Sequence, residues 1–109
     1  MYQIEDYCTE DGRIPFKEWL MGLADRQAKA RVLTRVQRMK TGNFGDCKPL
    51  QDGVWELRID HGPGYRIYYA QAGKTVFLLL IGGDKGKQQS DIAKAVSYWQ
   101  DWNRRTNHE

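Results

Sequence analysis

Residues 54–70 have the sequence VWELRIDHGPGYRIYYA. The apolar residues Trp55, Leu57 and Ile59 alternate with charged ones, which is the pattern of a β-strand that buries one face. The residues of the loop, His-Gly-Pro-Gly, favour a turn, and a second alternating run follows at once. This stretch therefore predicts a β-hairpin.

The hairpin determines where two arginines lie. In the simplest register Ile59 is opposite Tyr65, and Arg58 is then directly opposite Arg66. Their Cβ atoms would be about 5 Å apart, where like charges destabilise a sheet. Some other group must offset that cost.

Two explanations stay open for this arginine pair. Glu56 and Asp60 flank Arg58 at two positions' distance along the strand and could neutralise it. Alternatively an anionic ligand lies between the guanidinium groups, which suit a phosphate well. The sequence alone does not choose between a salt bridge and a binding site.

The other elements follow from apolar spacing and stop signals. We expect a first strand near residues 4–8, a helix opened by Pro15, a second helix that stops at Gly42, a turn at 71–74, a central strand Val76–Ile81 that ends at Gly82-Gly83, and a final helix over about 88–104. The predicted fold is a single α+β domain over residues 1–109. It has an N-terminal helical hairpin, a twisted and mainly antiparallel sheet of four or five strands packed on one face by helices, and a C-terminal helix.

Composition narrows the class of protein. The chain has 109 residues, of which 40% are hydrophobic and 28% charged, as in soluble globular proteins. Its longest apolar run, Val76–Ile81, is too short to cross a bilayer. The N-terminus resembles no secretory signal, and Cys8 and Cys47 form no metal-binding spacing. We expect a cytoplasmic protein with free, buried thiols and neither a metal nor another cofactor.

Basic residues cluster in two places. Six of them and no acidic residue lie between Arg26 and Lys40, and Lys85 and Lys87 follow the central strand. The positive charge of such clusters suits binding to a polyanion or to an acidic protein partner. A solvated helix face explains the first cluster equally well. The two lysines either extend the anion site of the arginines or are solvated loop residues.

Further side chains have two interpretations each. Tyr68 shares the face of the arginines, where it could stack on a base or simply pack on the surface. His61 lies in the loop of the hairpin and His108 lies near the end of the chain, so exposure is the simpler interpretation of both. No Walker motif or Gly-x-Ser-x-Gly motif is present, and a nucleotide-hydrolysing enzyme is disfavoured.

Four spaced motifs in the same order give a family resemblance over nearly the whole chain. They are Asp11-Gly12-Arg13-Ile14-Pro15-Phe16 with Trp19-Leu20, Val54-Trp55-Glu56-Leu57-Arg58, Gly62-Pro63-Gly64-Tyr65-Arg66-Ile67-Tyr68-Tyr69, and Leu78-Leu79-Leu80-Ile81-Gly82-Gly83-Asp84-Lys85. The chain resembles the RelE/ParE superfamily of toxins, and most closely its HigB-like, phage-related addiction module killer proteins.

The resemblance implies a toxin of a type II toxin–antitoxin system, with a helix-turn-helix antitoxin as partner. It implies a metal-independent messenger-RNA endonuclease that acts on the ribosome. The ParE side of the superfamily implies an alternative, a DNA gyrase poison, and a non-catalytic antitoxin-binding or phage regulatory module is a third possibility.

Site residues are carried over by position. Arg58 would orient the phosphate, Arg66 would bind and stabilise it, and Lys85 would add electrostatic help. Lys48, Tyr68 and Lys87 would bind RNA, with Lys48 as a loose equivalent of a lysine that some relatives use. The acid or base that active relatives carry near the C-terminus has no clear match here, and Tyr68 is the substitute that we expect if the arginines lower its pKa.

Overall fold

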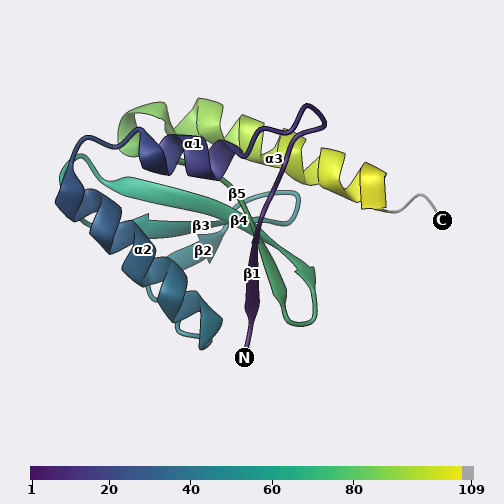
Figure 1. Ribbon diagram of the computed structural model, residues 1–109, viewed down its shortest axis with the longest axis horizontal. Helices are drawn as coiled ribbons and strands as arrows, with labels where there is room; N and C mark the ends of the chain where they lie inside the picture. The colour runs from purple at the N-terminus through teal and green to yellow at the C-terminus, as the bar shows by residue number, and fades with distance from the viewer. Residues whose placement is uncertain (107–109) are drawn as a thin grey trace.

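The computed structural model describes residues 1–106, so His108 lies outside the described residues. In chain order the elements are β1 (Gln3–Asp6), α1 (Pro15–Met21), α2 (Arg26–Lys40), β2 (Cys47–Pro49), β3 (Val54–Ile59), β4 (Tyr65–Gly73), β5 (Val76–Asp84), a 3-10 turn (Lys85–Lys87) and α3 (Gln88–Thr106) (Figure 1). The expected helix pair, hairpin and final helix are all present.

The strands form one sheet in the order β1-β5-β4-β3-β2. Every neighbouring pair is antiparallel except β1 and β5, which run parallel. The predicted α+β class with a mainly antiparallel sheet is therefore confirmed. β4 runs on through the stretch expected to be a turn, and the chain reverses after Gly73 instead.

Helices cover both faces of this sheet, so the expectation of one covered face is wrong. One core holds side chains of α1 and α2 against Leu57, Ile67 and Tyr69 of the sheet. The other holds α3 against Tyr68, Ala70 and neighbouring strand residues. The sheet is buried on both sides because β4 is apolar at almost every position from Tyr65 to Ala70, with Arg66 as the exception.

The glycine pair in β5 does not end the strand, contrary to the sequence-based expectation. Gly82 and Gly83 are buried strand residues, and β5 continues to Asp84. A Cβ atom at Gly82 would overlap the ring of Trp19 from α1, and one at Gly83 would overlap the carboxylate of Asp91 from α3. The two glycines thus let a helix approach the sheet closely on each face.

The start and end of α2 follow the signals of the sequence. Asp25 caps the helix by accepting hydrogen bonds from the backbone N–H groups of Gln27 and Ala28. Gly42 follows the helix in the left-handed region, with φ of +85°. Ala28, Val32 and Met39 are buried, as their spacing predicts.

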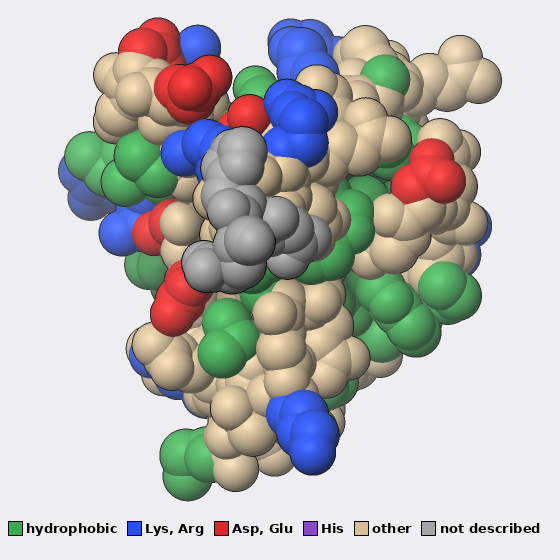
Figure 2. All heavy atoms as spheres, turned by 90° about the vertical axis from the view of Figure 1, so that its right-hand side faces the viewer, with side chains coloured by type: hydrophobic (Ala, Val, Ile, Leu, Met, Phe, Trp, Pro, Cys, Tyr) green, Lys and Arg blue, Asp and Glu red, His purple; other side chains and the backbone are tan. Residues whose placement is uncertain are grey.

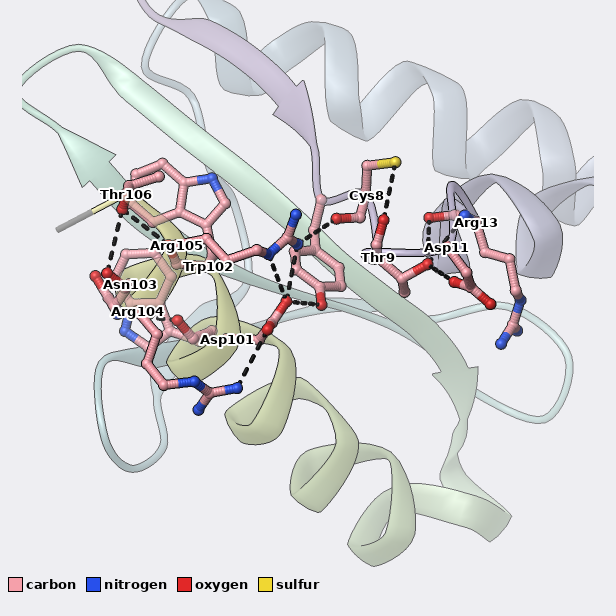
Figure 3. Close-up of polar contacts among 12 residues, drawn as sticks. Cys8, Thr9, Asp11, Arg13, Asp101, Trp102, Asn103, Arg104, Arg105 and Thr106 are labelled. Atoms are coloured by element: carbon pink, nitrogen blue, oxygen red, sulfur yellow. Dashed lines mark hydrogen bonds and ion pairs between the residues drawn. The ribbon is translucent and has the colours of Figure 1, made fainter. Parts of the chain in front are cut away.

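The end of α3 is held against the segment that follows β1. The Tyr7 hydroxyl donates to Asp101 Oδ2 at 2.6 Å, and Arg105 bonds both that carboxylate and the Cys8 carbonyl. Figure 3 shows Asp101 between Arg104 and Arg105, with Arg105 reaching across to Cys8. At this end of the molecule positive and negative side chains are interleaved (Figure 2).

Cys8 is exposed and Cys47 half-buried, both as free thiols, so the expected burial of Cys8 is wrong.

No helix among the described residues is long and apolar enough to cross a membrane.

Candidate functional site

Arg58 of β3 and Arg66 of β4 are direct cross-strand partners, with Ile59 opposite Tyr65. This is the register that the length of the hairpin loop predicts. Both side chains lie on the face of the sheet that α3 covers, because Tyr68, two residues beyond Arg66, belongs to the core beneath α3. Arg66 is almost buried, with 11% of its side chain exposed, whereas Arg58 is half-buried at 39%.

One carboxylate serves both arginines. Glu56 Oε1 lies 3.6 Å from Arg66 Nη1 and 3.8 Å from Arg58 Nε. The Glu56 side chain is fully buried, and its other oxygen accepts a hydrogen bond of 2.7 Å from Gln88 Nε2 at the start of α3. Both distances are longer than a hydrogen bond. The Glu56 carboxylate therefore attracts the two guanidinium groups without forming a close, bidentate ion pair with either one.

Exposed Asp46 supplies the second carboxylate of Arg58. Its Oδ1 atom is 3.6 Å from Arg58 Nε, and 63% of the Asp46 side chain is exposed. Of the two neighbours expected to neutralise Arg58, Glu56 does approach it. Asp60 forms no ion pair within the described part of the chain. The positive charge of the arginine pair is thus partly neutralised by carboxylates of the protein itself.

Buried polar atoms without a hydrogen-bond partner gather around this pair. Among the described residues they are Glu56 Oε1, Arg58 Nε, Arg66 Nε, Tyr68 Oη and Asp91 Oδ2. The first four residues lie on the α3 face of β3 and β4, where each is opposite another or two positions along the same strand. Asp91 packs on Gly83, which is paired with Arg66 across β4 and β5. Since buried polar groups are nearly always paired, such a cluster is typical of a functional site.

An open hollow lies beside the arginines, and we call it the arginine hollow. It has a volume of about 350 Å³. Its lining consists of Asp46, Arg58, Ile59, Asp60, Gly62, Pro63, Gly64, Arg66 and Lys85. Lys85 reaches it because its backbone N–H donates to the Gly64 carbonyl at 2.9 Å, which ties the end of β5 to the hairpin loop. The three residues expected to carry catalysis therefore line one hollow.

The hairpin loop is held in place from α2. His61 Nε2 lies 3.0 Å from Asp25 Oδ2, and this hydrogen bond is the main cause of the lowered pKa of the Asp25 carboxyl. His61 therefore links the loop to the N-terminus of α2, and with 16% of its side chain exposed it is not the simply exposed loop residue that the sequence favours. Gly62 and Gly64 both adopt positive φ, which the tight loop requires.

Arg35 of α2 supports the other side of the hollow. Its guanidinium donates to the carbonyls of Arg58 at 2.6 Å and of Phe44 at 3.0 Å. Burial lowers the pKa of Arg35. One of the six basic residues of α2 thus points inward and fixes the backbone at the arginine pair. It does not belong to a solvated helix face.

Tyr68 does not have the environment that we expected. It is fully buried, so it cannot stack on a base or reach a phosphate in this structure. Its pKa is raised, first by burial and then by the charges of Glu56 and Asp91, which outweigh the opposite effect of Arg66. The condition under which Tyr68 could act as the base, a pKa lowered by the arginines, is not met, and its phenol is a poor base here.

The two other residues expected to bind RNA lie apart from the arginines. Lys48 on β2 is exposed and pairs in register with Glu56, so it shares their face but does not line the arginine hollow. Lys87 lines a different hollow, together with Asp91 and Lys94 of α3. Of the two lysines after β5, only Lys85 joins the arginines.

Sequence reasoning missed Gln88, Asp46 and Asp91 as parts of this site. Gln88 and Asp91 lie at the start of a helix whose face toward the sheet only the three-dimensional packing reveals. Asp46 sits in a Gly-rich loop that gives no pairing signal. Among residues 1–106 no group of three or more histidine, cysteine, aspartate or glutamate side chains could hold a metal ion.

The model of a family described as Phage derived protein Gp49-like (DUF891) matches residues 18–96. The chain therefore belongs to this family, which is associated with toxin–antitoxin systems and related to RelE-type toxins. The matched region contains the whole arginine hollow.

A relative from Haemophilus influenzae (strain ATCC 51907 / DSM 11121 / KW20 / Rd) carries the description "Uncharacterized protein". It is 45% identical to this chain over 82 residues, which cover 75% of this chain and 83% of the relative.

Proposed function

We propose that this protein is the toxin of a type II toxin–antitoxin system, that it acts in the cytoplasm, and that it cleaves messenger RNA on the ribosome. The observation that carries the proposal is the arginine hollow, where Arg58, Arg66 and Lys85 converge on an open space of about 350 Å³. Family membership supports the toxin class. The HigB-like resemblance of the sequence motifs supports the choice of RNA as substrate.

The chemistry follows from the charges. In RNA cleavage of this type the ribose 2′-oxygen forms a bond to the adjacent phosphorus and the bond to the 5′-oxygen breaks, which leaves a cyclic phosphate and a free 5′-hydroxyl. Negative charge grows on the phosphate oxygens in the transition state, and guanidinium groups held in advance stabilise it. Arg66, which is nearly immobilised by burial, would bind the phosphate, and the more exposed Arg58 would orient it.

Proton transfer needs groups other than Tyr68. Asp46 and Asp60 are the carboxylates that line the arginine hollow, and either could accept the proton of the 2′-hydroxyl. Lys85 lies at the same hollow and would stabilise the phosphate or the leaving 5′-oxygen, which takes up a proton from the protonated carboxyl group or from water.

The test is induction of the wild type and of single variants in a bacterial host. Arg58→Ala and Arg66→Ala should each abolish growth arrest, because loss of one preorganised donor costs about 10²–10³ in rate. Lys74→Ala, at an exposed turn far along the sheet, is the matched control and should remain toxic. Primer extension on messages should show discrete ends with the wild type and with Lys74→Ala, and no such ends with either arginine variant.

Other outcomes identify the competing functions. If expression causes DNA breaks and leaves transcripts intact, the protein is a gyrase poison and the proposal of an RNA nuclease is wrong. Harmless expression of the wild type without its antitoxin would indicate a non-catalytic, antitoxin-binding module. Full toxicity of both arginine variants would overturn the assignment of the site.

A further inference from the structure

A second hollow with arginines in its lining lies between α2 and the end of β3, and we call it the α2 hollow. Its volume is about 350 Å³. Its lining consists of Ala30, Arg31, Thr34, Arg35, Arg38, Ile59 and Asp60. Three of these side chains carry a positive charge and one carries a negative charge, so the hollow is positive overall and attracts anions.

Arg31, Arg35 and Arg38 reach one hollow because they lie on one face of α2, at positions i, i+4 and i+7. Arg35 is used by the fold, since its guanidinium donates to backbone carbonyls of β3 and of the loop after α2. Arg31 and Arg38 are exposed, and neither side chain forms an ion pair or a hydrogen bond with another residue in the range 1–106. Their two guanidinium groups are therefore available to a ligand.

The positive charges in the α2 hollow are only partly balanced. Burial and, to a lesser extent, the charge of Arg38 lower the pKa of Arg35, so these two guanidinium groups are close enough to repel each other. Asp60 is the one carboxylate in the lining, and it forms no ion pair with a described residue. An anion bound by Arg31 and Arg38 would offset this repulsion.

The α2 hollow adjoins the arginine hollow. Ile59 and Asp60, at the end of β3, line both of them. β2 pairs with β3 only as far as Leu57, so β2 does not cover β3 at this point. An RNA strand with one phosphate in the arginine hollow can therefore continue past the end of β3 and place another phosphate in the α2 hollow. This continuity favours RNA over an acidic protein segment as the occupant.

We propose that the α2 hollow is a second phosphate subsite, in which Arg31 and Arg38 bind the phosphate of a nucleotide near the one that is cleaved. This inference rests on the proposed function, which places the reacting phosphate in the arginine hollow. Arginine suits the role because its planar guanidinium forms two parallel hydrogen bonds to a phosphate. A second bound phosphate fixes the position of the RNA strand, so the reacting phosphate meets Arg58 and Arg66 in a defined orientation.

A length series of oligonucleotides tests the subsite. The probes are 2′-O-methyl oligouridylates of two to five nucleotides, which cannot be cleaved because the attacking hydroxyl is blocked. They are titrated at low salt into the isotopically labelled full chain, and the backbone amide signals report binding. Affinity should rise in one step of about tenfold at the length that reaches the α2 hollow, and the signals of residues 30–38 should shift from that length onward.

Two double variants locate the step. Arg31→Ala with Arg38→Ala should remove the step and leave thermal unfolding unchanged, because both side chains are exposed and alanine favours a helix. The matched control, Arg26→Ala with Lys74→Ala, makes the same change in net charge at exposed positions outside both hollows and should keep the step. The slope of log affinity against log salt should be smaller by about 0.7 for the first variant only, since it gives up one phosphate contact.

Three results would overturn the subsite: no step in the wild type at millimolar oligonucleotide, a step of equal size in the variant without Arg31 and Arg38, or loss of the step in the control. A capped tetraglutamate peptide, which carries the same number of charges as the longest probe, tests the competing occupant. It should bind more weakly than that probe. Tighter binding that depends on Arg31 and Arg38 would assign the hollow to an acidic protein segment.

The subsite and the proposed function can fail separately. Arg58→Ala with Arg66→Ala should lose toxicity, while the longer probes still shift the signals of residues 30–38. A toxic wild type without the length step would contradict the phosphate subsite alone. A harmless wild type that shows the step would contradict the nuclease and leave the α2 hollow as an RNA-binding site.

Discussion

Arg58 and Arg66 face each other across β3 and β4, and both guanidinium groups approach the same oxygen of buried Glu56. Exposed Asp46 is a second carboxylate for Arg58, whereas nearly buried Arg66 has Glu56 as its carboxylate partner among the described residues. Glu56 is therefore the residue on which the geometry of the pair depends.

Replacing Glu56 by Gln should lower the free energy of unfolding by about 3 kcal/mol, because nearly buried Arg66 would lose its counter-ion. Chemical denaturation measures the loss. Asp46→Asn is the control, since its pair with Arg58 is exposed and contributes little. A Glu56→Gln variant as stable as the control would show that Glu56 does not hold the pair.

The glycine pair of β5 should not tolerate a side chain. Gly83→Ala places a methyl group on the Asp91 carboxylate, and Gly82→Ala places one on the Trp19 ring, so each should cost about 2 kcal/mol of unfolding free energy or more. Gly73→Ala in β4 is the comparison, because its nearest neighbour would be at an ordinary 3.9 Å. Thermal unfolding of the three variants would reveal any departure from this order.

Asp91 should make the protein less stable as the pH rises. Burial raises the pKa of this carboxyl above its ordinary 3.8. Between that value and the raised one, the folded state binds more protons than the unfolded state, so the free energy of unfolding falls with increasing pH. Asp91→Asn removes this contribution, and its stability relative to the wild type should therefore grow from pH 3.8 upward. A constant difference across that range would contradict the expectation.

Tyr7 should anchor the end of α3. Burial and the hydrogen-bonded Asp101 raise the pKa of Tyr7 to about 12. Tyr7→Phe should cost about 1 kcal/mol at neutral pH through the lost hydrogen bond. From pH 10 to 12 the folded state retains the phenolic proton longer than the unfolded state does, so the wild type loses stability there and the deficit of Tyr7→Phe shrinks. Denaturation at pH 8, 10 and 12 tests both statements, and an unchanged deficit would refute the second.

The sequence predicted the hairpin register because two constraints agreed there. Alternation assigned each residue of β3 to a face, and the loop length then placed Arg58 opposite Arg66. The same alternation failed at Glu56, which is charged and fully buried. A carboxylate in a strand favours the solvent face, and its burial is tolerable here because Arg58, Arg66 and Gln88 surround it.

Long-range packing explains the other differences. Gly82-Gly83 resembles a stop signal along the chain, yet the glycines serve the approach of Trp19 and Asp91 from opposite faces. Likewise, the apolar face of α3 is evident in the sequence, but which side of the sheet it covers is not. The placement of Arg58 opposite Arg66 was predictable from strand register, whereas the hollow that the two arginines share with Lys85 was not.

The bond between Tyr7 and Asp101 joins positions that are 94 residues apart, and the parallel pairing of β1 also needs β5 in place. During synthesis, the arginine hairpin of β3 and β4 therefore emerges before β5, while β1 still has no strand to pair with. Contacts of such long sequence separation form late and slowly. A nascent chain thus carries its cationic residues on an incomplete scaffold, and β1 and the segment after it are held in place only once β5 and α3 have been synthesised.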